Sequence, residues 1–204
     1  MQPEPGIPHT RAIDRAARIS DLRYDLRLCL PEARHAPIPG HVTIRFELSD
    51  ASRPLVVDFA PAGGAGVSSL RVNAAVAPPP LVPTGHIIIS EHLLRVGPNT
   101  IEAGFTAGDG PLNRRDTLLY SIFVPARAHE AFPCFDQPDL KARWTLTLDA
   151  PAQWQVVSNG PLAVADTDGD ADGSRVVSRF AETKPLPTYL FAFAAGEFLV
   201  DDGV

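Results

Sequence analysis

The sequence predicts an all-β protein: an antiparallel β-sandwich or open, barrel-like saddle of many short strands, with at most a short N-terminal helix. Two observations predict this class. The 204 residues include 21 Pro and 15 Gly, which favour turns, and 45% are hydrophobic, enough for a core. Apolar and polar residues also alternate in short runs separated by Pro or Gly. We expect an N-terminal arm or short helix over residues 1–20 and one β-domain over residues 21–204.

The first half of the chain contains the clearest alternation. Arg11 to Ser20 has a weak helical rhythm. Tyr24 to Leu30 and Val42 to Leu48 alternate apolar and polar residues, so each predicts a strand with one buried face. Pro37 to Gly40 lies between them and predicts a hairpin turn. Further short strands are predicted at Leu55–Phe59, Leu70–Val72, Ile87–Ile89, Thr100–Phe105 and Leu118–Val124.

The second half continues the same pattern. Strands are predicted at Trp144–Leu148, Gln155–Ser158 and Arg175–Phe180. Tyr189–Phe193 is a continuous apolar run, which predicts a strand covered on both faces. No internal repeat has a fixed period, so the pattern indicates one domain rather than an array.

Charge and composition exclude some classes of protein. The net charge is −6 and the arginines are scattered, whereas nucleic-acid binding needs clustered Lys and Arg. No apolar stretch is long enough to span a membrane. Met1 to Asp14 lack an apolar signal core, and a parent protein in the cytoplasm or outside the cell is equally compatible. The two cysteines, Cys29 and Cys134, are expected to be free core thiols.

The sequence contains no complete catalytic motif among those considered. A zinc helix needs His-Glu-x-x-His, but the residue four after His129 is Pro133. His86 and His92 flank an apolar run and are better explained as ordinary histidines than as metal ligands. Cys134 and His129 could form a Cys/His pair, but the apolar flank of Cys134 favours a buried structural thiol.

Two polar segments also suggest sites of low specificity. Gly63 to Gly66 lacks the Lys and the strand-to-helix context of a phosphate loop, which favours a flexible loop. Asp166 to Gly173 spaces its carboxylates like a calcium loop, but Val177 stands where that loop needs Glu. A solvated hairpin turn is therefore the preferred interpretation.

One segment, Tyr120 to Leu148, is far more specific. It contains the run Phe132, Pro133, Cys134, Phe135, Asp136, Gln137, Pro138, followed by Lys141, Ala142 and an alternating strand. This resembles the amino-terminal domain of the aminopeptidase N-like zinc peptidases (gluzincins), which carries a Phe-Pro-Cys-x-Asp-x-Pro segment. Three more segments stand in the family's order: Leu94–Ile101, Val157–Gly160, and Pro187–Phe193 with Gly196–Phe198. The resemblance spans roughly residues 20–200.

The residues of this run, which we call the motif loop (Phe132–Pro138), suggest a rigid loop on physical grounds. Pro133 and Pro138 exclude a central strand or helix interior, because proline lacks the N–H donor. Asp136 is well placed to accept backbone N–H bonds in the turn. Phe132 and Phe135 can anchor the loop in apolar surroundings. We therefore favour a structural role for the loop over a catalytic one.

The resemblance also implies that catalysis and zinc binding belong to another domain. In that family the zinc ligands lie in a second, following domain, so this chain is expected to hold no catalytic and no metal-binding residue. Zinc would belong to a catalytic domain of the same polypeptide, against which this domain packs and whose substrate cleft it walls. The expected partners are that domain and peptide substrates, with no nucleic acid and no membrane span.

The resemblance further implies a Gln or Glu, ten residues before the family's Cys, that holds the amine of the substrate. That position is Val124 here, and the other usual polar position is Ile122. Neither side chain binds an ammonium group. Either the catalytic domain supplies amine recognition or the specificity differs, so we assign no substrate-binding residue.

Two other classes of function stay open at this point. A stand-alone β-sandwich binding module without enzymatic activity would need a contiguous apolar or aromatic surface patch. A small Cys-dependent enzyme would need a reactive thiol at Cys134.

Overall fold

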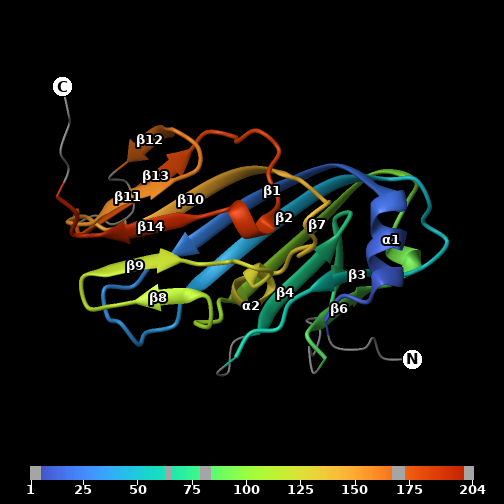
Figure 1. The fold of residues 1–204 in the computed structure, drawn as a ribbon, viewed down its shortest axis with the longest axis horizontal. Coiled ribbons are helices and arrows are strands. Elements are labelled where there is room, and N and C mark those ends of the chain that lie inside the picture. The colour runs from blue at the N-terminus through green and yellow to red at the C-terminus, as the bar shows by residue number, and fades with distance from the viewer. Residues whose placement is uncertain (1–5, 63–65, 79–83, 167–172, 200–204) are drawn as a thin grey trace.

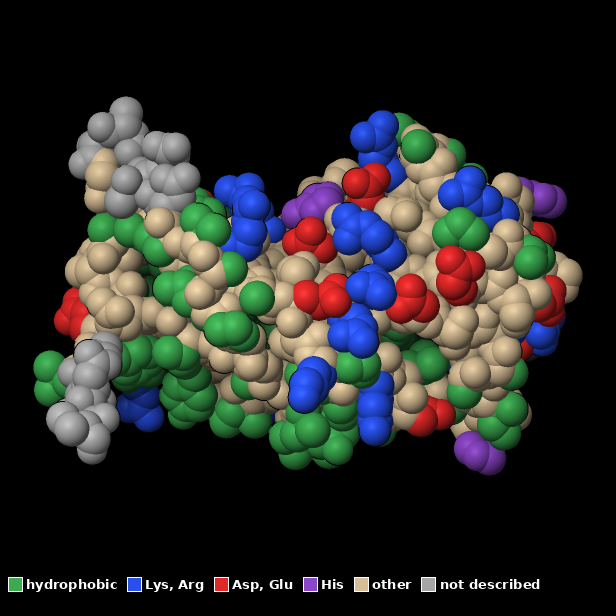
Figure 2. Space-filling model, turned by 90° about the horizontal axis from the view of Figure 1, so that it is seen from above, with side chains coloured by type: hydrophobic (Ala, Val, Ile, Leu, Met, Phe, Trp, Pro, Cys, Tyr) green, Lys and Arg blue, Asp and Glu red, His purple; other side chains and the backbone are tan. Residues whose placement is uncertain are grey.

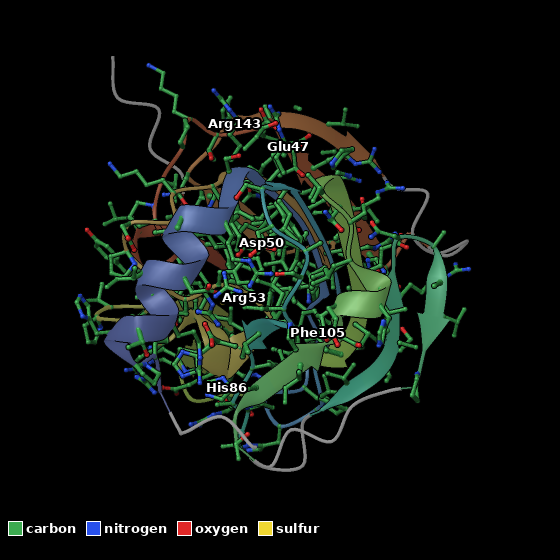
Figure 3. All side chains as sticks on the ribbon, turned by 90° about the vertical axis from the view of Figure 1, so that its right-hand side faces the viewer. Glu47, Asp50, Arg53, His86, Phe105 and Arg143 are labelled. Carbon is green, nitrogen blue, oxygen red and sulfur yellow. The ribbon has the colours of Figure 1, made fainter. Side chains whose placement is uncertain are left out.

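The computed structural model describes residues 6–62, 66–78, 84–166 and 173–199, and these form three β-sheets around one core (Figure 1). Helix α1 (His9–Arg18) precedes the first strand and lies across one end of the sheets, as the view along the molecule shows (Figure 3). The chain is therefore all-β with a short N-terminal helix, as predicted, and the division at residue 20 stays a prediction.

The largest sheet has eight strands. In spatial order they are β12 (Leu162–Asp166), β13 (Arg175–Phe180), β10 (Arg143–Pro151), β1 (Ile19–Cys29), β2 (Pro39–Leu48), β7 (Gly97–Thr106), β4 (Val67–Val72) and β5 (Ala75–Ala77). Neighbours run antiparallel except β1 and β10, which pair in parallel with Tyr24 opposite Trp144. The predicted hairpin is present as β1 and β2.

Two smaller sheets complete the fold. One has four strands in the order β11 (Gln155–Ser158), β14 (Phe193–Gly196), β9 (Leu118–Ser121) and β8 (Leu112–Arg114), and the other pairs β3 (Leu55–Asp58) with β6 (His86–Ile89). Three short helices connect strands: η1 (Glu91–Leu93), α2 (Ala128–Ala131) and η2 (Thr188–Leu190).

The core lies between the large sheet and the smaller elements. Alternate residues of β1 and β10 point inward, and a ring stack forms there because Trp144 lies between Tyr24 and Phe191. The ring centroids are 4.1 Å and 4.3 Å from that of Trp144, and the ring planes are nearly parallel. The sheets are thus joined through aromatic side chains contributed by β1, β10 and the segment after η2.

Two predicted strands are wrong in part. Tyr189–Phe193 does not form a strand covered on both faces, because its first residues belong to η2 and β14 begins only at Phe193. Phe191 is buried whereas Leu190 is 51% exposed, so the apolar run is divided between core and surface. The strand predicted over Leu118–Val124 ends at Ser121, and the residue after Val124 is Pro125, which has no N–H to continue a ladder.

The sequence pattern also left five short elements unassigned, namely η1, α2, β5, β8 and β12. Each has at most five residues, too short to show a period. Two segments predicted to be loops lie largely outside the described residues, namely 63–65 of the glycine-rich run and 167–172 of the acidic run.

Candidate functional site

The motif loop follows α2 and passes through the interior of the protein. Residues 132–137 are buried, and Pro138 is exposed. Cys134 forms an isolated β-bridge with Asp58 at the end of β3, with backbone N–O distances of 2.8 and 3.0 Å. The loop is therefore held by the two-stranded sheet without joining it as a strand.

Both phenylalanines anchor the loop. The ring of Phe132 makes edge contacts with Phe123, Trp144 and Phe191, with centroid distances of 5.5 to 6.2 Å. Phe135 meets the edge of Phe46 at 5.8 Å. These contacts bind the loop to the aromatic core of the fold.

Tyr24 links the loop to the large sheet. Its hydroxyl oxygen accepts the backbone N–H of Phe135 at 2.8 Å, and its ring stacks on Trp144. Gln137 makes a similar link at the other end, because its Nε2 donates to the carbonyl oxygen of Ala12 in α1 at 2.9 Å. The loop thus connects α1, the large sheet and the two-stranded sheet.

Asp136 joins three segments through its buried carboxylate. Oδ1 accepts the hydroxyl of Thr188 in η2 at 2.6 Å. Oδ2 lies 2.6 Å from Nδ1 of His129 and accepts the backbone N–H of the same residue at 3.2 Å. The backbone donor thus comes from α2, not from the turn that contains Asp136.

The ion pair with Asp136 controls the titration of His129. Burial by itself lowers the pKa of His129, but the hydrogen bond and the charge of Asp136 outweigh it, so the net pKa lies above the ordinary 6.5. The charged imidazolium is therefore favoured in the folded state.

We expect the stability of the protein to fall as the solution becomes alkaline. The pairing of His129 contributes stability that is fully present below about pH 6.5 and is lost as pH rises through the higher folded pKa. Melting temperatures measured by differential scanning calorimetry should decline as the pH is raised from about 6.5 through the folded pKa of His129. The decline should be smaller in the His129→Gln variant. His92→Gln is the control, since the His92 side chain is 86% exposed, and an equal flattening by both variants contradicts the prediction.

A second buried ionic cluster lies beside the loop. Arg15 of α1 donates from both terminal nitrogens to the carboxylate of Asp58, at 2.7 and 2.8 Å, and also to the carbonyl oxygen of Val56 at 2.7 Å. The guanidinium lies 5.4 Å from the ring centre of Phe135. The Asp58 carboxylate also accepts the backbone N–H of Asp136 at 3.1 Å. Arg15 and Asp58 therefore fix α1 and β3 to the motif loop.

His86 completes this cluster. Its Nδ1 lies 3.2 Å from Oδ1 of Asp58, and its Nε2 lies 3.0 Å from a guanidinium nitrogen of Arg11. Burial works to raise the pKa of Asp58, but the hydrogen bonds from His86 and Arg15 and the Arg15 charge overcome it and leave the pKa low. The carboxylate is thus ionised and fully engaged by positive or donor groups.

A pocket of about 280 Å³ opens beside both clusters and is lined in part by Asp58, His86 and His129. Within the described parts of the chain, no three His, Cys, Asp or Glu side chains gather closely enough to hold a metal ion. His86 and His92 differ in environment, because the side chain of His86 is 3% exposed and that of His92 is 86% exposed. The expectation that this chain holds no zinc stays a prediction.

Cys134 and His129 do not form a nucleophilic pair. Cys134 is fully buried, and burial raises the pKa of its thiol well above its ordinary value, with the carboxylates of Asp136 and Asp58 adding to the shift, so the thiolate that a nucleophile needs is disfavoured. No disulfide joins the two cysteines; Cys134 is buried and Cys29 is half-buried.

We expect the two thiols to differ in reactivity. In the native protein at neutral pH, iodoacetamide should modify only Cys29, and slowly, because burial also raises the pKa of Cys29. Both thiols should react in denaturant. Mass spectrometry of the labelled peptides measures this, and rapid native labelling of Cys134 contradicts it.

The sequence did not reveal Arg15, Asp58, His86, Tyr24 or Thr188 as partners of the motif loop. Each is far from the loop in sequence, and only Thr188 lies in a segment that the resemblance singled out, Pro187–Phe193. One weak signal existed: Asp58 ends an apolar strand, and a carboxylate there needs a partner if it is buried.

A second feature is a set of exposed or half-exposed apolar residues on the four-stranded sheet and in the segments that flank it. Val157, Ala194 and Tyr120 are cross-strand neighbours on β11, β14 and β9. Ile122 and Val124 flank Phe123 and are 43% and 54% exposed. Val157 and Leu190 are 56% and 51% exposed. We call these six residues the apolar face: Tyr120, Ile122, Val124, Val157, Leu190 and Ala194.

The sequence is similar to the N-terminal part of known aminopeptidases. Residues 109–190 match the family model of the Peptidase M1 N-terminal domain, a range that contains the whole motif loop and Thr188. Aminopeptidase M1-A of Oryza sativa subsp. japonica is 28% identical over 199 residues, which is 86% of this chain and 22% of that protein. Human Aminopeptidase Q is 36% identical over 85 residues, which is 41% of this chain and 9% of that protein.

The fold has close counterparts among solved structures. The M1 zinc metallopeptidase from Deinococcus radiodurans superposes with a TM-score of 0.73 at 19% identity, covering 88% of this chain and 42% of that one. The chain thus spans 22% or less of the two curated relatives named above and less than half of the solved structure. Over residues 109–190 the chain is similar to the N-terminal domains of M1 family aminopeptidases, and its fold is that of an M1 zinc metallopeptidase structure.

Proposed function

We propose that this chain is the non-catalytic N-terminal domain of a zinc-dependent aminopeptidase that releases N-terminal residues from peptides. A catalytic domain of the same polypeptide would hold the zinc ion and carry out hydrolysis. This domain would pack against it and form one wall of the substrate cleft. The observation that carries the proposal is the match of residues 109–190 to the Peptidase M1 N-terminal domain. The apolar face lies within and beside that segment and would form the interface.

The pattern of burial explains why this surface needs a covering partner. Phe123 and Phe191 face each other in the core with ring centroids 6.3 Å apart. Their chain neighbours Ile122, Val124 and Leu190 are exposed to water. Contiguous exposed apolar surface is a common mark of an interface, since covering it removes apolar area from water. Figure 2 shows hydrophobic side chains gathered along its lower edge, on the half of the molecule that holds β8, β9 and β14.

The charge distribution supports a positioning role rather than a chemical one. The carboxylates of the motif region are bound by basic side chains of the same chain, as the pairs Asp136 with His129 and Asp58 with Arg15 show. Their buried donors and acceptors fix the shape of the loop. We propose that the motif loop has a structural role: it connects α1 and the sheets and so fixes the position of the apolar face.

Amine recognition in the proposed enzyme falls to other residues. Val124 and Ile122 offer no hydrogen-bond acceptor in their side chains for an ammonium group. An apolar wall at this position suits contact with hydrocarbon, either of the substrate or of the catalytic domain. No step of hydrolysis is assigned to a residue of this chain.

The test uses the chain alone and the polypeptide that its gene encodes. The isolated chain should not hydrolyse aminoacyl p-nitroanilides and should bind no stoichiometric zinc by plasma mass spectrometry. The full polypeptide should do both and lose activity to a chelator. In it, Val124→Asp with Leu190→Asp should lower kcat/KM by about tenfold or more, because charges would be buried at the interface.

Val76→Asp is the matched control. Val76 is 77% exposed on the edge strand β5 and lies outside the apolar face, so its replacement should leave kcat/KM unchanged. Chelator-sensitive hydrolysis by the isolated chain overturns the proposal. A gene that encodes no zinc-binding domain also overturns it and favours a stand-alone binding module.

A further inference from the structure

The outward face of the large sheet carries a polar hollow that the proposed function does not use. It has a volume of about 350 Å³ and is formed by β13, β10, β1 and β2. The charged and hydroxyl side chains that line it include Arg27, Arg179, His41, Thr147, Thr43 and Asp25. Figure 2 looks down on this side of the molecule, where basic and acidic side chains lie among one another.

Strand register places four of these residues in one row. Thr147 of β10 is opposite Arg179 of β13 on one side and Arg27 of β1 on the other, and Arg27 is opposite His41 of β2. Cross-strand partners share a face of the sheet, and neighbouring strands are about 4.8 Å apart. The row therefore spans roughly 15 Å, within which two long arginine side chains can reach one small ligand above Thr147.

The cations of this row are not neutralised by the protein. Among the described residues, Arg27 and Arg179 form no ion pair, and Asp25 is the one acidic residue that lines the hollow. Other arginines on the same sheet are paired: Arg23 and Arg143 with Glu182, and Arg175 with Asp149. Arg179 of β13 and Arg27 of β1 are separated by one strand, β10, so their like charges repel across the hollow unless an anion lies between them.

Two hydroxyl groups supply neutral donors to the same space. Thr147 and Thr43 are only 6% and 7% exposed, yet within the described chain their hydroxyls make no hydrogen bond. A nearly buried hydroxyl that opens into a hollow is a donor available to a ligand. The row thus combines two guanidinium forks, an imidazole and a hydroxyl.

From this arrangement we infer that the hollow binds a phosphate-type oxyanion, either free phosphate or the phosphoryl group of a monoester. Arg27 and Arg179 each present a planar fork that matches two oxygens of such an anion. Thr147 lies between them and donates to a third oxygen. His41 closes the row on the β2 side, and Asp25 faces the part of the ligand that carries no negative charge.

The site is independent of the proposed domain interface. The aromatic core separates the large sheet from the four-stranded sheet, so their outward faces point away from each other (Figure 1). A domain that covers the apolar face leaves the hollow open to solvent. Failure of either proposal therefore says nothing about the other.

Isothermal titration calorimetry of the chain with inorganic phosphate and with phenyl phosphate tests the inference. Saturable binding of one ligand per chain is expected. Arg27→Met and Arg179→Met should each weaken it by about tenfold or more, because each removes charge-assisted hydrogen bonds. Arg27→Lys should weaken it less, since the charge stays while the fork is lost. Tighter binding of phenyl phosphate identifies a monoester as the ligand, and equal binding identifies free phosphate.

Arg45→Met is the matched control. Arg45 lies on the same face of β2 as His41, four residues or about 13 Å further along the strand. This distance exceeds the Debye length of about 8 Å at physiological salt, so the charge of Arg45 is largely screened from the hollow. Its replacement should change the affinity by less than about twofold. No measurable binding, or an equal loss with Arg45→Met and Arg27→Met, overturns the inference. Arg27, Arg179 and Arg45 are all exposed, so unchanged melting temperatures will show that the variants fold.

Discussion

Arg15→Met is expected to lower the free energy of unfolding by about 3–5 kcal/mol, because it leaves the Asp58 carboxylate buried without its main partner. The two side chains are 1% and 2% exposed, and both terminal nitrogens of Arg15 bind the carboxylate. Methionine has a similar length and fills much of the space, so the loss reports the charge rather than a cavity. Urea denaturation followed by tryptophan fluorescence measures it.

Two variants separate this effect from general damage. Arg53→Met removes an arginine whose side chain is 58% exposed in its pairs with Asp14 and Asp50, and it should cost less than about 1 kcal/mol. Figure 3 labels Arg53 and Asp50 beside α1. Arg15→Met combined with Asp58→Asn should recover part of the loss, since no buried charge remains. Equal losses from Arg15→Met and Arg53→Met contradict the prediction.

The cluster around Arg15 also shows where sequence reasoning stops. Alternation identified β1, β2, β10, β11 and β13, because a period of two reports which side chains face the core. The weak helical rhythm near the N-terminus predicted an arm or a short helix, but nothing in it indicated that Arg15 is buried. That burial depends on Asp58, which is 43 residues away, and pairing at such a distance is set by the fold rather than by local pattern.

The same limit applies to the motif loop. The two prolines and the aspartate predicted a rigid turn from local chemistry alone. The partners that hold Asp136 come from α2 and from η2, 52 residues further along the chain. The short helix η2 was itself mistaken for part of a strand, because a continuous apolar run carries no information about period. Local residues thus predicted the type of loop, whereas the chain topology decides what holds it.

Trp144→Ala is the second variant with a large expected effect, a loss of about 3–5 kcal/mol in the free energy of unfolding. Trp144 is fully buried and stacks between Tyr24 and Phe191, with Phe132 at its edge. Removing it opens a cavity at the junction of the large sheet, the motif loop and η2. Chemical denaturation monitored by circular dichroism measures the loss, and Trp144→Phe should cost less because part of the stack is kept.

Loss of the Trp144 ring should also destabilise the motif loop, because Tyr24 connects the two. The ring of Tyr24 is held by the stack, and its hydroxyl accepts the backbone N–H of Phe135. Amide hydrogen exchange at Phe135 should therefore become faster in Trp144→Phe, even where the protein stays folded. Leu190→Ala is the control, since Leu190 is 51% exposed and its truncation should change stability by about 0.5 kcal/mol or less. Unchanged exchange at Phe135 in Trp144→Phe would separate the loop from the aromatic stack and leave the Asp58 bridge as its principal anchor.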